Sequence, residues 1–161
     1  MQKIHAVLLV TCCVLGIWLV AMVSWRQYVE TTLLNNPTIK RAGIFGLGDP
    51  VKEYACVNFN PHLDEMSVLA RSFADPRRIV AGGIKLEGET YVCVMSNANT
   101  IRGRSQKRGC VAMKTHRCVI VAVYDEAAKS SNSAMGSVMK LANYLTAHNF
   151  WTFLLLPHLY M

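Results

Sequence analysis

The sequence lacks the cysteine and histidine patterns of metal-binding proteins. Its six cysteines form no CxxC pair, and no group of cysteines and histidines has the spacing of a zinc site. Cys56, Cys93 and Cys118 lie within apolar, strand-like runs, where a reduced cysteine behaves as a small buried hydrophobe. This context favours free thiols over a disulfide framework, and therefore a reducing compartment. We expect no metal and no other cofactor.

Catalytic motifs are also missing. Cys110 and His116 are a possible thiol and base, but six residues along a hairpin do not establish contact, and no oxyanion-forming loop is apparent. Gly46 and Gly48 lack the third glycine and the following helix of a dinucleotide fingerprint. We therefore predict that the protein catalyses no reaction.

Acidic residues are scarce. Ten Asp and Glu stand against 17 Lys and Arg, a formal net charge of +7, and no acidic residue occurs between Glu89 and Asp125. Such a balance favours an acidic protein face, an anionic lipid surface or nucleic acid as partner. Nucleic acid is not expected, because no aromatic residues interleave the basic ones as stacking on single strands requires.

The two ends of the chain differ from its middle. Residues 6–23 carry no charge and are rich in Val, Leu and Ile, which is typical of a signal peptide or a marginal membrane helix. Residues 151–161 are also apolar, but too few to span a bilayer. The length and a hydrophobic fraction of 52% suit one domain with one core. We expect a hydrophobic leader at 1–21, a single domain at 22–150 and an apolar extension at 151–161.

The middle of the chain has the pattern helix, two strands, helix, meander, helix. Ser24 and Gln27 form a capping-box signature before the first helix, and apolar residues at helical spacing predict helices over 63–73 and 134–148. Asn97–Asn99, Arg108-Gly109 and His116-Arg117 mark tight turns between strands. Strands are predicted over 42–47, 54–57, 83–86, 91–96, 100–104, 110–114 and 118–124. This order indicates an α/β (α+β) domain on a central antiparallel sheet of about six or seven strands, with helices covering its faces.

Four stretches in this order resemble the profilin family. Residues 24–29 (SWRQYV) are similar to the family's opening SWQxYV, and 82–88 (GGIKLEG) to its G-[IL]-x-L-x-G hairpin. Ile101-Arg102-Gly103 with Lys114-Thr115 resembles the IRGKKG…KKT ribbon, and 141–145 (LANYL) the RLGDYL terminus. The similarity covers roughly 24–150. It implies a profilin-like fold, in which the N- and C-terminal helices pack side by side on one face of the sheet and shorter helices cover the other.

The resemblance implies a groove for proline-rich peptides between these two helices. Such peptides adopt the polyproline II helix before they bind, so they need flat aromatic faces and donors for their carbonyls. The alternative is that the same aromatics are core residues, since the spacing of an amphipathic helix looks identical; for Tyr54 the two interpretations stay equally open. The residues expected in the groove are Trp25, Tyr28, Tyr54, Tyr144, Leu145 and Phe150.

The resemblance also implies that the basic ribbon and the start of the last helix contact monomeric actin. The alternative is a merely solvated basic face. Gln106 and Arg108 stand where family members often have glycines, which makes the tip of the ribbon more charged. The residues expected to contact actin are Arg77, Arg102, Arg104, Lys114 and Lys140. Those expected to hold phosphoinositide headgroups are Arg78, Arg104 and Lys107.

Together these features predict a mostly monomeric, cytoplasmic adaptor of the cytoskeleton. It would bind actin monomers, proline-rich actin-assembly factors and anionic phosphoinositides, and so regulate actin polymerisation. A second hypothesis is a membrane-anchored or secreted profilin-fold protein with a surface or lipid-binding role, which would keep residues 1–21. A third is a related α/β sensor domain for a small ligand. We also expect residues 151–156 to fold over Trp25 and Tyr28 and to weaken peptide binding.

Overall fold

A seven-stranded sheet forms the centre of the protein. The computed structural model describes residues 24–125 and 130–147, so the leader, the C-terminal extension and Phe150 lie outside it. The strand order is β2-β1-β7-β6-β5-β4-β3, and every neighbouring pair is antiparallel. The strands are β1 (Ile39–Gly46), β2 (Lys52–Val57), β3 (Ile84–Leu86), β4 (Glu89–Ser96), β5 (Thr100–Arg104), β6 (Arg108–Lys114) and β7 (Cys118–Asp125). The helices are α2 (Trp25–Tyr28), which continues as the π-helix η1 (Val29–Leu33), and α3 (Leu63–Ser72), α4 (Arg77–Gly82) and α5 (Ser130–Ala147).

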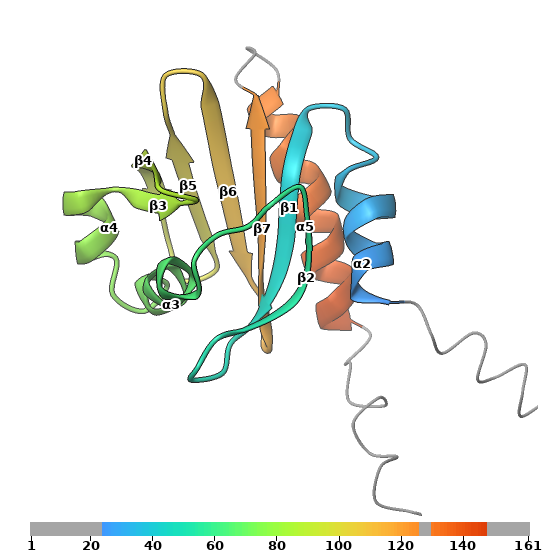
Figure 1. Cartoon of the computed structure of the whole chain (residues 1–161), viewed down its shortest axis with the longest axis horizontal. Coiled ribbons are helices and arrows are strands. Elements are labelled where there is room, and N and C mark those ends of the chain that lie inside the picture. Colours follow the sequence, from blue (N-terminus) through green and yellow to red (C-terminus); the bar gives the residue numbers. More distant parts are fainter. Residues whose placement is uncertain (1–23, 126–129, 148–161) are drawn as a thin grey trace, which may run out of the picture.

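Helices cover both faces of this sheet (Figure 1). The inner strand β7 is buried on both sides, because its residues alternate between the two layers. Ile120 and Ala122 belong to the core beneath α2, η1 and α5, whereas Val119 and Val121 belong to the core beneath α3 and α4. The predicted arrangement, with the terminal helices on one face and shorter helices on the other, is confirmed.

Several local features differ from the sequence-based prediction; the last helix, for example, begins at Ser130 and not at residue 134. The helix α4 was not predicted, because six residues after Pro76 are too few to show a helical period. The turn predicted at Arg108-Gly109 is wrong: both residues lie in β6, and the turn spans residues 105–107, closed by a bond from the Ser105 N–H to the Arg108 carbonyl. Gly109 lies opposite Tyr124 in β7, where its missing side chain leaves room for the tyrosine ring.

The β3–β4 hairpin is fastened to the rest of the molecule by carboxylates. Glu65 in the first turn of α3 accepts hydrogen bonds from the backbone N–H groups of His62, Glu87 and Gly88. Glu87 in turn accepts from the Arg41 guanidinium of β1 and from the Asn60 N–H. The hairpin, which lies at the far edge of the sheet from β1 and β2, is thereby held by α3 and β1.

Glu89 of β4 holds a second group of polar side chains together. Its carboxylate accepts hydrogen bonds from the Tyr91 hydroxyl (2.9 Å), the Arg108 guanidinium (3.0 Å) and the Ser105 hydroxyl (3.1 Å). Partial burial raises the pKa of Glu89, but these bonds outweigh it, so the pKa lies below its ordinary value.

We expect Glu89 to contribute to acid denaturation. A carboxyl whose pKa is lowered by folding stabilises the native state above its ordinary pKa, and this contribution is lost as the pH falls through the lowered value. Glu89→Gln should therefore flatten the fall of the free energy of unfolding in that acidic range, measured by urea denaturation at several pH values. The matched control is Asp64→Asn, an exposed carboxylate on α3. Equal acid sensitivity in wild type and Glu89→Gln would contradict the assignment.

None of the helices in the part of the chain that the structure describes is long and apolar enough to cross a membrane.

Candidate functional site

Four aromatic rings form a continuous row across three elements, which we call the aromatic row. Tyr54 of β2 stacks on Trp25 of α2, with ring centroids 5.0 Å apart and an interplanar angle of 24°. Trp25 lies 6.4 Å from Tyr28, and Tyr28 lies 5.7 Å from Tyr144 of α5. The two end members, Tyr54 and Tyr144, are 41% and 42% exposed. Sequence positions 25, 28, 54 and 144 are thus brought together at one surface.

The first helix is built so that two of these rings lie half out of the core. Ser24 caps α2 by accepting a hydrogen bond from the Gln27 N–H, which fixes where the helix begins. Val29 and Leu33 are fully buried, whereas Trp25 and Tyr28 pack against the edge of the same core. The rings therefore have one supported side and one side toward solvent.

Tyr28 of the row remains neutral at physiological pH. Burial, together with a hydrogen bond to Tyr144, raises the pKa of Tyr28 to about 12. A neutral phenol can still donate to a carbonyl, and the row therefore combines aromatic faces with hydroxyl groups.

A glycine beneath Tyr54 sets the position of that ring. A Cβ atom built on Gly46 of β1 would lie 2.5 Å from the Tyr54 hydroxyl oxygen and 2.7 Å from its Cζ atom. The tyrosine ring therefore lies against bare backbone, which no larger residue allows. The sequence placed Gly46 in the strand predicted over 42–47, but it gave no sign of this role.

Four of the six predicted groove residues form the aromatic row, and the other two are Leu145 and Phe150. Leu145 is 7% exposed and belongs to the core beneath α5, so it supports the row from inside and is not part of the exposed surface. Phe150 lies outside the described residues.

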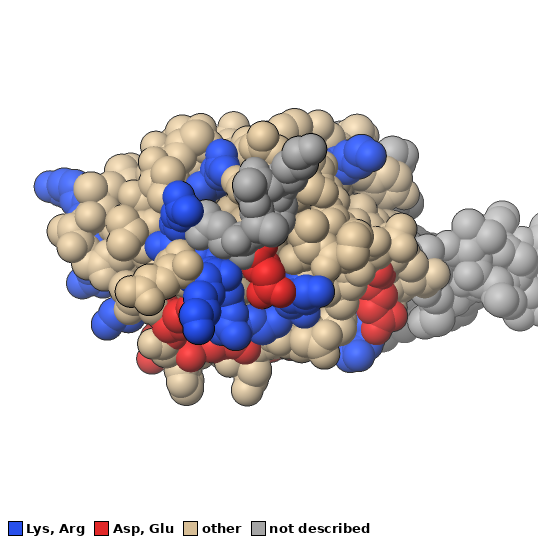
Figure 2. Space-filling view, turned by 90° about the horizontal axis from the view of Figure 1, so that it is seen from above, with Lys and Arg blue, Asp and Glu red and all other residues tan. Residues whose placement is uncertain are grey.

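A second surface lies on the same face of the sheet, where β4 and β5 extend beyond α5. The helix packs mainly on β6 and β7. The uncovered strands present two exposed valines, Val92 (69%) and Val94 (63%), next to two arginines, Arg102 and Arg104, which the register places beside them. We call these four residues the β4–β5 surface. Figure 2 shows lysine and arginine side chains gathered on the end of the molecule seen from above, with acidic ones among them.

The valines were missed in the sequence analysis. The sequence nevertheless contained a signal for them. Val92 and Val94 alternate with the half-buried Cys93, so β4 carries apolar side chains on both of its faces. On a strand near the edge of a sheet, this pattern indicates a surface that a partner covers. Val80 on α4 is likewise 64% exposed.

The predicted actin-contacting cations do not all lie together. Arg102 donates to the Ser131 hydroxyl at the start of α5, which joins β5 to that helix. Lys114 is in phase with the core residues Cys110 and Ala112, so strand alternation directs it to the opposite face from Arg102. Arg77 of α4 pairs with Asp75 through two bonds, of 2.8 and 2.6 Å. Lys140 is exposed on α5.

The predicted phosphoinositide residues divide between two places. Arg104 ends β5 and Lys107 lies in the following turn. Arg78 instead lines a cleft between α3, α4 and β3.

The structure offers no support for thiol or metal chemistry. Cys110 is 3% exposed, and burial raises the pKa of its thiol to about 12, so it holds no reactive thiolate. Among the described residues, no group of three His, Cys, Asp or Glu side chains lies close enough to hold a metal ion.

Comparison with known proteins agrees with this geometry. The family model described as Profilin matches residues 23–150. Profilin of Schizosaccharomyces pombe is 33% identical over 76% of this chain and 95% of its own length, and Profilin-1B of Acanthamoeba castellanii is 32% identical over 79% and 99%. Among solved structures, Acanthamoeba castellanii profilin IA superposes with a TM-score of 0.73 at 31% identity, covering 79% of this chain and all of that one.

Proposed function

Because this chain belongs to the profilin family, whose members are non-enzymatic actin-binding proteins, we propose that it binds monomeric actin on the β4–β5 surface and proline-rich peptides on the aromatic row. Holding both ligands, it would deliver monomers to proline-rich assembly factors and so regulate actin polymerisation. The observation that carries this proposal is the aromatic row itself.

The row suits a polyproline II ligand for three physical reasons. Successive rings, 5.0 to 6.4 Å apart, offer a line of flat apolar faces to a stiff and extended chain. Such a ligand is already ordered, so little conformational entropy opposes binding. The row also carries hydroxyl groups and an indole N–H, the kinds of group from which such exposed carbonyls accept hydrogen bonds.

Mouse profilin IIa, which shares this fold with a TM-score of 0.60 at 14% identity, has been solved in complex with a double repeat from the FH1 domain of mDia1. That complex motivates the choice of ligand here. The direct test is retention of the full chain on immobilised poly-L-proline with elution by free peptide. Flow-through of the wild-type chain would refute this half of the proposal.

The β4–β5 surface suits a protein partner that is partly apolar and partly acidic. Exposed valines beside arginines can bury apolar area at the centre of a contact while the charges steer and orient the partner. Arg102 is already oriented by Ser131, whereas Arg104 is exposed at the end of β5. We propose Val92, Val94, Arg102 and Arg104 as the central contacts, with Val80, Lys140 and Arg77 at the edge. Lys114, on the opposite face of β6, would contribute through the net positive charge.

Arg104→Glu is expected to weaken binding to actin monomers by about tenfold or more, because it places a like charge against an acidic partner. The affinity can be measured from the suppression of spontaneous actin polymerisation. The wild-type affinity should also fall as salt is added. The matched control is Lys52→Glu, the same charge change on β2 at the other edge of the sheet. If the control weakens binding as much as Arg104→Glu, net charge and not this surface governs the interaction.

The exposed tip of the β5–β6 ribbon also motivates the finer proposal that the chain binds phosphoinositides. Arg104 and Lys107 are both exposed there, at the end of β5 and in the turn that follows. Multivalent anionic headgroups are attracted by such clusters. Because Arg78 lies on α4 and not in this ribbon, it would contact a headgroup separately from these two residues.

A further inference from the structure

The chain that follows α5 is strongly apolar and starts at one end of the aromatic row. Helix α5 ends at Ala147, three residues after Tyr144, which is an end member of the row. Residues 148–161 contain no Asp, Glu, Lys or Arg, and five of the six residues at 151–156 are Trp, Phe or Leu. Such a run is costly to expose to water, because each apolar side chain favours burial. Contact with a nearby apolar surface removes this cost.

The covalent tether keeps residues 151–156 within reach of the row. The Cα atom of Trp151 lies at most about 14 Å from that of Ala147, because only three residues separate them. Six residues in extended form cover about 20 Å. That length suits the row, whose neighbouring ring centroids are 5.0, 6.4 and 5.7 Å apart. A tethered segment has an effective concentration in roughly the millimolar range, so even weak contacts compete with a free peptide.

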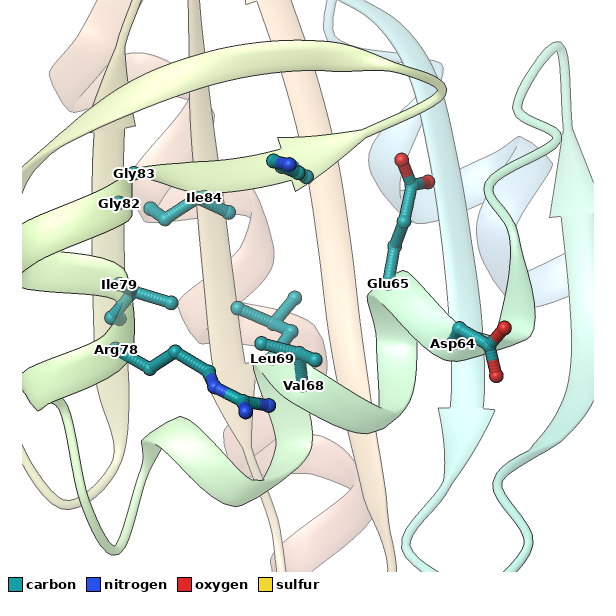
Figure 3. A pocket seen from close by; sticks show the side chains of 10 residues that line it. Asp64, Glu65, Val68, Leu69, Arg78, Ile79, Gly82, Gly83 and Ile84 are labelled. Carbon is teal, nitrogen blue, oxygen red and sulfur yellow. The ribbon is translucent and has the colours of Figure 1, made fainter.

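Two other arrangements suit the structure less well. The leader also joins the molecule at the row, but it enters at Trp25, an inner member, so it would have to turn back to cover both ends of the row. The cleft between α3, α4 and β3 is partly apolar, but Asp64, Glu65 and Arg78 line it with charges of both signs (Figure 3). That cleft also lies on the opposite side of the sheet from α5 (Figure 1). The row is both near to the segment and composed of uncharged rings.

We propose that residues 151–156 bind along the aromatic row of the same molecule and compete there with proline-rich peptides. The segment begins at Tyr144 and runs toward Trp25 and Tyr54, with its apolar side chains against the rings. This regulation rests on the proposed peptide site, because the segment and the peptide use the same rings. A segment that covers the row for about nine-tenths of the time lowers the apparent affinity for the peptide about tenfold. The full chain therefore still binds the peptide, but more weakly than the row alone would.

The first test compares the full chain with a chain that ends after Phe150. The probe is a fluorescein-labelled proline decamer, whose fluorescence anisotropy gives the dissociation constant. Removal of residues 151–161 should strengthen binding about fivefold or more, because the peptide then has no competitor. Replacement of the five apolar residues at 151–156 by serine keeps the chain length and should strengthen binding equally. The matched control is deletion of residues 157–161 alone, which should leave the affinity of the full chain unchanged.

A second measurement does not depend on the peptide. In ¹H–¹⁵N spectra of the chain without ligand, the serine replacement should shift the amide signals of the four row residues. The amide signals of Val92 and Val94, on the β4–β5 surface, should keep their positions. Such shifts without peptide binding by any of the chains would support the docking of the segment and would refute the proposed peptide site instead.

Three results would overturn the inference. They are equal peptide affinity of the full chain and the chain ending after Phe150, equal strengthening by the control deletion, and amide signals of the row that the serine replacement leaves in place. Deletion of residues 1–21 forms a further arm and should leave the affinity unchanged. If that deletion strengthens peptide binding as much as removal of residues 151–161 does, the leader covers the row and the inference is wrong. A competition that appears only at high protein concentration would assign the contact to a second copy of the chain and would likewise overturn it.

Discussion

Replacing Trp25 by alanine is expected to abolish retention of the chain on immobilised poly-L-proline. Trp25 is one of the two inner members of the aromatic row, stacked on Tyr54 at 5.0 Å and next to Tyr28 at 6.4 Å. Its loss would break the row into an isolated Tyr54 and a Tyr28–Tyr144 pair. Truncation of a central aromatic anchor typically costs about 2 kcal/mol or more, which corresponds to a loss of affinity of roughly 30-fold or more.

Neighbouring variants show whether the ring itself is responsible. Gln27→Ala changes an exposed residue of the same short helix and should retain wild-type binding. Trp25→Phe keeps an aromatic face but removes the indole N–H, so an intermediate affinity is expected. The thermal unfolding of each variant is recorded alongside. A folded Trp25→Ala variant that still binds the column like the wild type would show that the row is only core packing.

Gly109→Ala is expected to destabilise the protein strongly, although it adds a single methyl group. A Cβ atom at this position would lie 2.2 Å from Cζ and 2.4 Å from the hydroxyl oxygen of Tyr124. Tyr124 is buried in the core beneath α5, so its ring has no free space to move into. Overpacking of this kind costs about 1–3 kcal/mol, and the clash here is with a large and rigid ring.

The same substitution elsewhere in the chain provides the control. Gly136 lies within α5, and a Cβ atom there would meet nothing within 4 Å. Gly136→Ala should therefore be neutral or stabilise by about 0.5–1 kcal/mol, since alanine favours the helix. Urea denaturation of both variants gives the comparison directly. Equal free energies of unfolding for the two would show that the Tyr124 ring does not rest on Gly109.

The sequence predicted the order of elements well because their signals are local. Alternating or continuous apolar runs marked most of the strands, and capping at Ser24 marked the first helix. The roles of glycines were not accessible in this way. Gly109 resembled a turn residue, and Gly46 was placed in a strand with no reason for its glycine, whereas both lie in strands beneath a tyrosine ring, at Tyr124 and Tyr54 respectively. Which ring covers a glycine depends on register between distant strands, and no local pattern contains it.

The candidate sites, too, could be predicted only in part, because local motifs are visible in the sequence but contacts between distant elements are not. Trp25 and Tyr28 were identified from the opening motif, and the structure joins them to Tyr54 and Tyr144. Lys114 was grouped with Arg102 from its neighbourhood in the ribbon, but strand alternation separates the two faces. The exposed pair of valines on β4 was overlooked, because its meaning depends on how far α5 reaches across the sheet.

The helix α5 touches both proposed ligand surfaces with its two ends. Ser131 near its start holds Arg102 of the β4–β5 surface, and Tyr144 near its end completes the aromatic row. Thirteen residues at a rise of 1.5 Å each place these contacts about 20 Å apart along the helix. Occupancy of one surface thus leaves the other unobstructed, so a ternary complex is geometrically allowed. If one ligand tilts α5 when it binds, the tilt also moves the surface that binds the other ligand. Any cooperativity between the two ligands should therefore depend on α5.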